Sequence, residues 1–214
     1  MDAAWAIRLA FAMTHLNHEA GAVLFNDLQA CYDRVIESFA NMSLRAMGAP
    51  AQVLKLHAAV KSNAVYHLVS KHGVSQQSIQ HSPQSPILGC GQGDGDSPAR
   101  WQAVSTPLLR TYEQHAHPLL FQAPDPKQTV AVHMTTFVDD AKSVVSYQPP
   151  SDSSKADTEE QLLSMVQENS SLWAKIVNVA GQKLETPCFS FVCTVLMIPV
   201  IHFCDPLNKF YQFQ

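Results

Sequence analysis

The spacing of apolar residues predicts several helices in the first third of the chain. The apolar residues that recur at helical intervals near the N-terminus are Trp5, Leu9, Met13 and Leu16. We therefore expect an amphipathic helix over 3–17. Helical periodicity returns over 35–47 and stops at Gly48, with Pro50 beyond it, a pattern typical of a helix end. A further helix is expected over 51–61.

Two later helices are also expected. Ser97 is a good N-cap and Pro98 suits a first turn, so a helix is predicted to begin there and to run to about His115. The second begins near Asp157 and ends at Gly181. Its apolar side consists of Leu162, Val166, Trp173, Ile176 and Val177.

Apolar and β-branched segments between these helices predict strands. The expected strands are 22–25, 64–70 with a hairpin turn at 71–73, 129–138, a returning strand at 143–145, and a pair within 189–201. Residues 148–160, rich in Pro, Ser and Thr, are expected to form a mobile surface loop. Helices and strands do not alternate regularly, so the pattern favours the α+β class.

Composition and charge exclude several classes of protein. The 214 residues are 46% hydrophobic and carry a formal charge of only −4, which does not suit a disordered chain or a strongly basic nucleic-acid binder. The apolar run 189–203 is interrupted by Pro199 and His202 and is too short to span a membrane. Five scattered cysteines offer neither a disulfide framework nor a paired zinc motif. We expect an intracellular protein, with nucleus or cytoplasm unresolved.

The first segment with candidate chemistry is 25–34. Asp27 ends an apolar strand, and Asp33 follows six residues later, where a helix is about to begin. A carboxylate at a strand end can bind a hard cation through oxygen. Alternatively, Asp27 caps a turn and Asp33 caps the helix.

The second segment is 89–98, which holds four of the eight glycines within seven residues and leads into a helix. Glycines there allow a backbone to approach a ligand or another part of the chain closely. The spacing matches neither a phosphate-binding loop nor a dinucleotide-binding motif. A plain flexible loop is the alternative.

The third segment, 137–140, ends in the adjacent carboxylates Asp139 and Asp140. They follow a very apolar strand and are expected at a hairpin tip, although Asp is also a common turn residue. At about 4 Å, two unit charges repel by about 4 kcal/mol at an effective dielectric constant near 20. Gathering these acids with Asp27 in one cleft would therefore raise the pKa of a carboxyl group or require a divalent metal ion.

In this order, the three segments resemble the palm of reverse transcriptases, especially those of retrotransposons without long terminal repeats. The family's first motif matches 27–35, with Cys31 and Tyr32 in the places of its Ala-Phe pair. Its Gly-x-x-Gln-Gly-x-x-x-Ser-Pro motif matches 89–98, and its Tyr-Ala-Asp-Asp box matches 137–140. The helix that closes on Ala-Gly-Gln-Lys-Leu, 173–184, is similar to the fourth motif. The resemblance covers about residues 20–191.

The resemblance implies a fold and a division of the chain. It implies an α+β polymerase-type palm, an antiparallel sheet with helices packed on one face, with the fingers truncated and the thumb absent. Residues 1–191 would form this palm with partial fingers, including the loop at 148–160. Residues 192–214 would form an apolar C-terminal tail of uncertain structure.

The resemblance also implies a reaction, the transfer of a nucleotide to a primer 3′-hydroxyl by two metal ions. The residues expected to bind two Mg²⁺ or Mn²⁺ ions and to be catalytic are Asp27, Asp139 and Asp140. Tyr32 would exclude a 2′-hydroxyl from the sugar site, and Gln92 and Gly93 would contact the template and the nucleotide. The implied partners are an RNA or DNA template with its primer and deoxynucleoside triphosphates, with no membrane.

Two other functions remain open. The family carries a Lys just before the Cys that follows its fourth motif, whereas residues 185–188 read Glu-Thr-Pro-Cys. That Lys is a candidate acid for the leaving pyrophosphate, so its absence favours low or no activity of this chain alone. A catalytically inactive remnant of a retroelement is therefore the main alternative. A metal-binding α+β module unrelated to polymerases is the third.

Overall fold

The computed structural model describes residues 3–84, 86–91, 94–122, 129–137, 140–184, 188–193 and 201–203. Their internal contacts divide the chain into two compact units. The first unit comprises 1–30 and 106–214, and the second comprises 31–105. The boundary at residue 105 falls inside helix α4 (Ser97–Glu113), and each unit is considered by itself.

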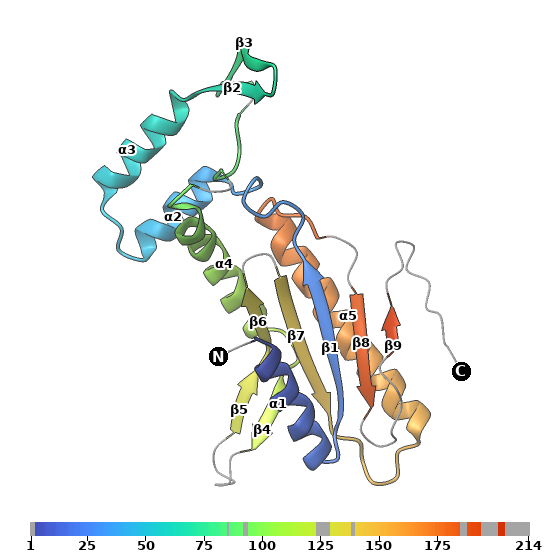
Figure 1. The fold of residues 1–214 in the computed structure, drawn as a ribbon. Coiled ribbons are helices and arrows are strands. Elements are labelled where there is room, and N and C mark those ends of the chain that lie inside the picture. The colour runs from blue at the N-terminus through green and yellow to red at the C-terminus, as the bar shows by residue number, and fades with distance from the viewer. Residues whose placement is uncertain are drawn as a thin grey trace. The chain divides into compact units, whose positions relative to one another are not determined.

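The first unit is built around a five-stranded sheet with the order β6-β7-β1-β8-β9 (Figure 1). Its strands are β1 (Ala20–Asp27), β6 (Met134–Phe137), β7 (Asp140–Tyr147), β8 (Cys188–Cys193) and β9 (Ile201–Phe203). Every neighbouring pair is antiparallel. A separate two-stranded sheet pairs β4 (Leu119–Gln122) with β5 (Thr129–Val132). The predicted α+β class with an antiparallel sheet is therefore confirmed.

Helices cover both faces of the five-stranded sheet. Because side chains alternate along a strand, Ala20 and Ala22 face α5 (Lys155–Val179), where they pack with Val145, Leu162 and Val166. Val23 faces the other way and packs with Val144, with Leu119 of β4 and with Ala10 of α1 (Ala3–Leu16). The prediction that helices pack on one face is wrong, because β1 is apolar on both of its faces and each requires a cover (Figure 1).

Two predicted boundaries change in the structure. The expected strand over 129–138 is divided at His133 into β5 and β6. The expected mobile loop over 148–160 is too long, because α5 already begins at Lys155. Ser154 caps that helix: its hydroxyl accepts a hydrogen bond from the Asp157 backbone at 3.1 Å, and the Asp157 carboxylate accepts one from the Ser154 backbone. Because of this capping box, the helix begins at Lys155, earlier in the chain than predicted.

The second unit carries three helical segments and a hairpin. Helix α2 spans Glu37–Ala46, α3 spans Ala51–Ser62, and the hairpin pairs β2 (Val65–Ser70) with β3 (Gly73–Gln80). The first turns of α4 complete the unit. Helix α2 begins after Ile36 without a side-chain cap, so the alternative in which Asp33 caps this helix is wrong. Within the described residues, no helix is long and apolar enough to cross a bilayer.

Candidate active site

Two of the predicted metal ligands lie directly opposite each other on neighbouring strands. Strand β1 ends at Asp27, β7 begins at Asp140, and these two residues are register partners. Directly opposed residues of an antiparallel pair have Cβ atoms about 4.5–5.5 Å apart. Both residues are exposed. The sheet thus brings together two carboxylates that are 113 positions apart in the sequence, at the end of the sheet where β1 finishes (Figure 1).

The strands predicted on either side of residues 138–139 pair in the structure. Strands β6 and β7 are antiparallel, and Phe137 is the register partner of Asp140. Asp139, the remaining predicted metal ligand, falls outside the described residues. The same holds for Gln92 and Gly93, the two predicted contacts to template and nucleotide.

A cation lies on the same sheet face as the two carboxylates. Phe25 and Asp27 are two positions apart on β1, so their side chains leave the same face of the sheet. Lys142 is the register partner of Phe25, and its Nζ lies 5.7 Å from the centre of the Phe25 ring. A lysine over an aromatic ring is a favourable cation–π arrangement. Lys142 therefore places a positive charge close to the acidic strand ends.

The donor set at this edge suits a hard divalent ion. Mg²⁺ is bound in proteins through one or two carboxylates and keeps several further oxygen ligands, and exposed strand ends leave room for them. Among the described residues, no group of three or more His, Cys, Asp and Glu side chains gathers in a metal-binding arrangement. The full predicted set contains Asp139 in addition to the described Asp27 and Asp140.

The segment that follows Asp27 lies beside the end of the predicted fourth motif. Leu28 forms an antiparallel bridge with Leu184. The backbone N–H of Gln29 donates to the carbonyl of Lys183 at 2.8 Å. Strand β7, which precedes α5, thus pairs with β1, and residues 183–184, which follow α5, bond to the residues directly after β1.

In the second unit, the glycine-rich segment is hydrogen-bonded to the segment that carries Tyr32. The N–H of Cys90 donates to the Tyr32 carbonyl at 2.9 Å, and the N–H of Gly89 donates to the Val35 carbonyl at 2.9 Å. Gly89 has φ +89°, and a Cβ built on it would lie 2.6 Å from the Cα of Asp33. Only glycine fits this close approach. Two segments 58 positions apart, which the sequence marked separately, are therefore in contact.

The buried side chain of Cys90 also contributes to the contact between these two segments. It is fully buried, and burial raises the pKa of its thiol, so the group stays protonated and is available as a weak donor. Its Sγ lies 3.7 Å from the Tyr32 carbonyl and 4.0 Å from the Ser97 carbonyl. The Ser97 hydroxyl in turn donates to the Gly91 carbonyl at 2.7 Å. Ser97 is thus bonded to Gly91, and Cys90 is bonded to Tyr32.

A charged cluster holds the far end of the segment. The side chain of Arg100 is only 3% exposed; its Nε donates to Asp96 at 2.7 Å and one Nη donates to Glu37 at 2.9 Å. Nε2 of His57 lies 2.7 Å from the same Asp96 carboxylate. Partial burial raises the pKa of the Asp96 carboxyl, but the Arg100 hydrogen bond and the charges of His57, Arg100 and Lys61 outweigh it, so the pKa lies below its usual value. Asp96 is thus held as an anion.

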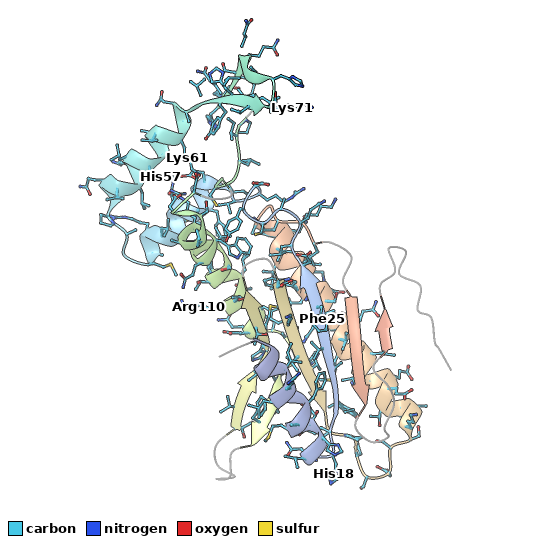
Figure 2. All side chains as sticks on the ribbon, viewed as in Figure 1. His18, Phe25, His57, Lys61, Lys71 and Arg110 are labelled. Carbon is cyan, nitrogen blue, oxygen red and sulfur yellow. The ribbon has the colours of Figure 1, made fainter. Side chains whose placement is uncertain are left out.

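Sequence reasoning missed this cluster. His57 and Lys61 are spaced four residues apart on a predicted helix, which places them on one face, and that spacing was an available signal (Figure 2). Their partners lie up to 43 positions away in the sequence, and no local pattern points to them. The Nζ of Lys61 donates to the Gly89 carbonyl at 3.0 Å.

No protein-family model matches this chain, and no curated protein matches it in sequence.

Proposed function

We propose that this chain is a reverse transcriptase-like palm of the kind carried by retrotransposons without long terminal repeats, and an RNA-directed DNA polymerase in reaction class. The observation that carries the proposal is the register pairing of Asp27 with Asp140 at adjoining strand ends. The resemblance places its first and third motifs at these two residues. Two carboxylates held opposite each other could bind the pair of metal ions, about 3.5–4 Å apart, that this kind of nucleotidyl transfer uses.

Two further contacts support the proposal. The glycine-rich segment is bonded to the backbone of Tyr32, the residue that the resemblance assigns to the sugar of the incoming nucleotide. The segment that ends the fourth motif is bonded to the residues directly after Asp27. Motifs that are far apart in the sequence are thus neighbours within their own units.

Asp27, Asp139 and Asp140 would hold the two metal ions, Mg²⁺ or Mn²⁺, which supply the Lewis acidity for attack of the primer 3′-hydroxyl on the α-phosphate and for departure of pyrophosphate. The pairing of β1 with β7 would set the backbone spacing of Asp27 and Asp140 before the ions bind. Tyr32 would select deoxynucleotides by occupying the space of a 2′-hydroxyl, and Gln92 and Gly93 would contact template and nucleotide.

A catalytically inactive remnant of such an element is the second candidate, and one observation favours it. Residues 185–188 read Glu-Thr-Pro-Cys and lack the Lys that the family places before the Cys. Loss of a general acid reduces a rate by about 10²–10⁴-fold. The formal charge of −4 also implies few contacts to nucleic-acid phosphates and a shallow dependence of binding on salt.

The first test is a titration of Mn²⁺ into the wild type, Asp27→Asn and Asp139→Asn. We expect at least about tenfold weaker binding in each variant, a loss of about 1.4 kcal/mol. Asp152→Asn removes an exposed carboxylate before α5 and serves as the charge-matched control that keeps wild-type affinity. Equal affinities across all four proteins would exclude a shared metal site at these strand ends.

The second test separates the polymerase from the remnant by primer extension on an RNA template with Mg²⁺ in low salt. Extension that Asp139→Asn abolishes supports the polymerase, and Tyr32→Ala should then incorporate ribonucleotides more readily. Mn²⁺ binding without extension supports the remnant. Unchanged discrimination between the two sugars in Tyr32→Ala would remove the sugar-selecting role.

A further inference from the structure

Helix α3 is attached to its own unit by polar contacts. None of its residues is buried, and its exposed apolar residues include Val53, Leu56 and Val60. The hydrogen bonds and ion pairs that connect it to more distant parts of the unit come from His57 and Lys61. Helices are normally held in place by a buried apolar face, so the polar attachment of α3 indicates that His57 and Lys61 have a specific role.

The two side chains reach opposite ends of one segment. His57 and Lys61 are one helical turn apart and leave the same face of α3. Lys61 donates to the carbonyl of Gly89 at 3.0 Å, and Nε2 of His57 lies 2.7 Å from the carboxylate of Asp96. Gly89 is the first residue of the glycine-rich segment 89–98, and Asp96 lies just before its Ser-Pro end. One turn of helix thus spans the base of that segment.

The ring of His57 links two charged groups of the cluster. Its Nδ1 contacts an Nη of Arg100, and its Nε2 lies 2.7 Å from the Asp96 carboxylate. Glu37 faces the same ring, with Oε1 3.4 Å from Nδ1. His57 therefore connects a buried cation to an anion at the segment end.

The far end is held by charged groups around the buried Arg100. Arg100 is almost fully buried and is neutralised by Asp96 and Glu37. Removing one partner of a buried charged pair is strongly destabilising, so these groups stay engaged in the folded unit. Lys61 also lies 4.0 Å from Glu37, which connects the two ends of the segment through α2.

We infer that His57 and Lys61 are positioning residues that hold the described ends of the glycine-rich segment, 89–91 and 94–96, in place beside the Tyr32 backbone, and so set the affinity for the incoming nucleotide. The inference rests on the proposed function, since the proposed function is what assigns Tyr32 and this segment to nucleotide binding. The pair acts through the segment ends: Lys61 orients the carbonyl of Gly89, whose N–H bonds Val35, and His57 orients Asp96.

The experiment compares Lys61→Met and His57→Leu with Lys55→Met, a control on the exposed side of the same helix. Amide hydrogen exchange is the first measurement. We expect the Gly89 and Cys90 amides to exchange about tenfold faster in the two test variants, since each loses a hydrogen bond at a segment end. Exchange in the hairpin 65–80 should not change. Faster exchange throughout 31–105 would indicate general destabilisation and would overturn the inference.

Nucleotide affinity is the second measurement, with dTTP as the probe and Mn²⁺ affinity measured in parallel. We expect weaker dTTP binding in Lys61→Met and His57→Leu with unchanged Mn²⁺ affinity, and recovery in His57→Gln, which retains one donor and one acceptor. If the wild type binds dTTP and the test variants bind it equally well, the positioning role is wrong while the proposed function stands. If the wild type binds neither Mn²⁺ nor dTTP, the proposed function fails and the positioning role fails with it.

Discussion

Replacing Gly89 by alanine tests whether the contact between the glycine-rich segment and the Tyr32 segment is as close as the structure has it. Gly89 adopts φ +89°, and an added Cβ would lie 2.6 Å from the Cα and 2.7 Å from the carbonyl carbon and oxygen of Asp33. All three are backbone atoms, which cannot rotate away as a side chain does. The segment must move, and the hydrogen bonds from Gly89 to Val35 and from Cys90 to Tyr32 lengthen.

The magnitude follows from two effects. A non-glycine residue in a left-handed conformation costs about 1–2 kcal/mol. Overpacking a well-filled site costs about 1–3 kcal/mol more, so Gly89→Ala should lower the free energy of unfolding by about 2–5 kcal/mol. Gly48 is the matched control in the same unit: its φ is +98°, and no described atom lies within 4 Å of an added Cβ. Gly48→Ala should therefore cost only the conformational strain, about 1–2 kcal/mol.

The assay is urea unfolding of the wild type and both variants, followed by a signal from the second unit. We expect a lower midpoint for Gly89→Ala than for Gly48→Ala, with an unchanged dependence on urea concentration, which reports equal exposure of surface. If Gly89→Ala is no less stable than Gly48→Ala, the close approach to Asp33 is absent and the contact between the two segments is wrong.

Three further predictions concern the first unit. Burial raises the pKa of Tyr112 from its usual 10 to about 12, so its contribution to stability is complete below pH 10 and is lost as the pH rises toward 12; urea midpoints measured against pH should fall less steeply in Tyr112→Phe. Ser154→Ala should cost about 1 kcal/mol in urea unfolding, and adding Asp157→Ala should cost less than its separate effect, because the two residues cap each other. Asp140→Asn should melt no lower than the wild type in EDTA, because it removes a like charge opposite Asp27; a lower melting temperature would contradict that repulsion.

The sequence by itself determined most of the regular elements. Helices α1, α3 and α5 and the hairpin formed by β2 and β3 were predicted close to their observed bounds. These elements are encoded in neighbouring residues, through apolar periodicity and through turn residues such as Gly73. The apolar run before Asp27 and the apolar segment before Asp140 likewise predicted two strands ending at acids.

The tertiary structure alone decided how these elements meet. The four residues of β4 carry no alternating pattern, so the sequence missed a strand that exists because β5 pairs with it. Helix α1 covers a second face of the sheet because β1 is apolar on both sides, and a strand's own sequence does not say which helix will cover it.

The site divides in the same way. The acids and the glycine-rich segment were visible as local patterns, but the pairing of Asp27 with Asp140 depends on strand register across 113 positions. The links from His57 and Lys61 to Arg100 and Gly89 join residues 43 and 28 positions apart. From the sequence alone, a polar side chain on an exposed helix face is expected to contact only solvent. Only folding brings an enclosed arginine and a backbone carbonyl within hydrogen-bond distance of it.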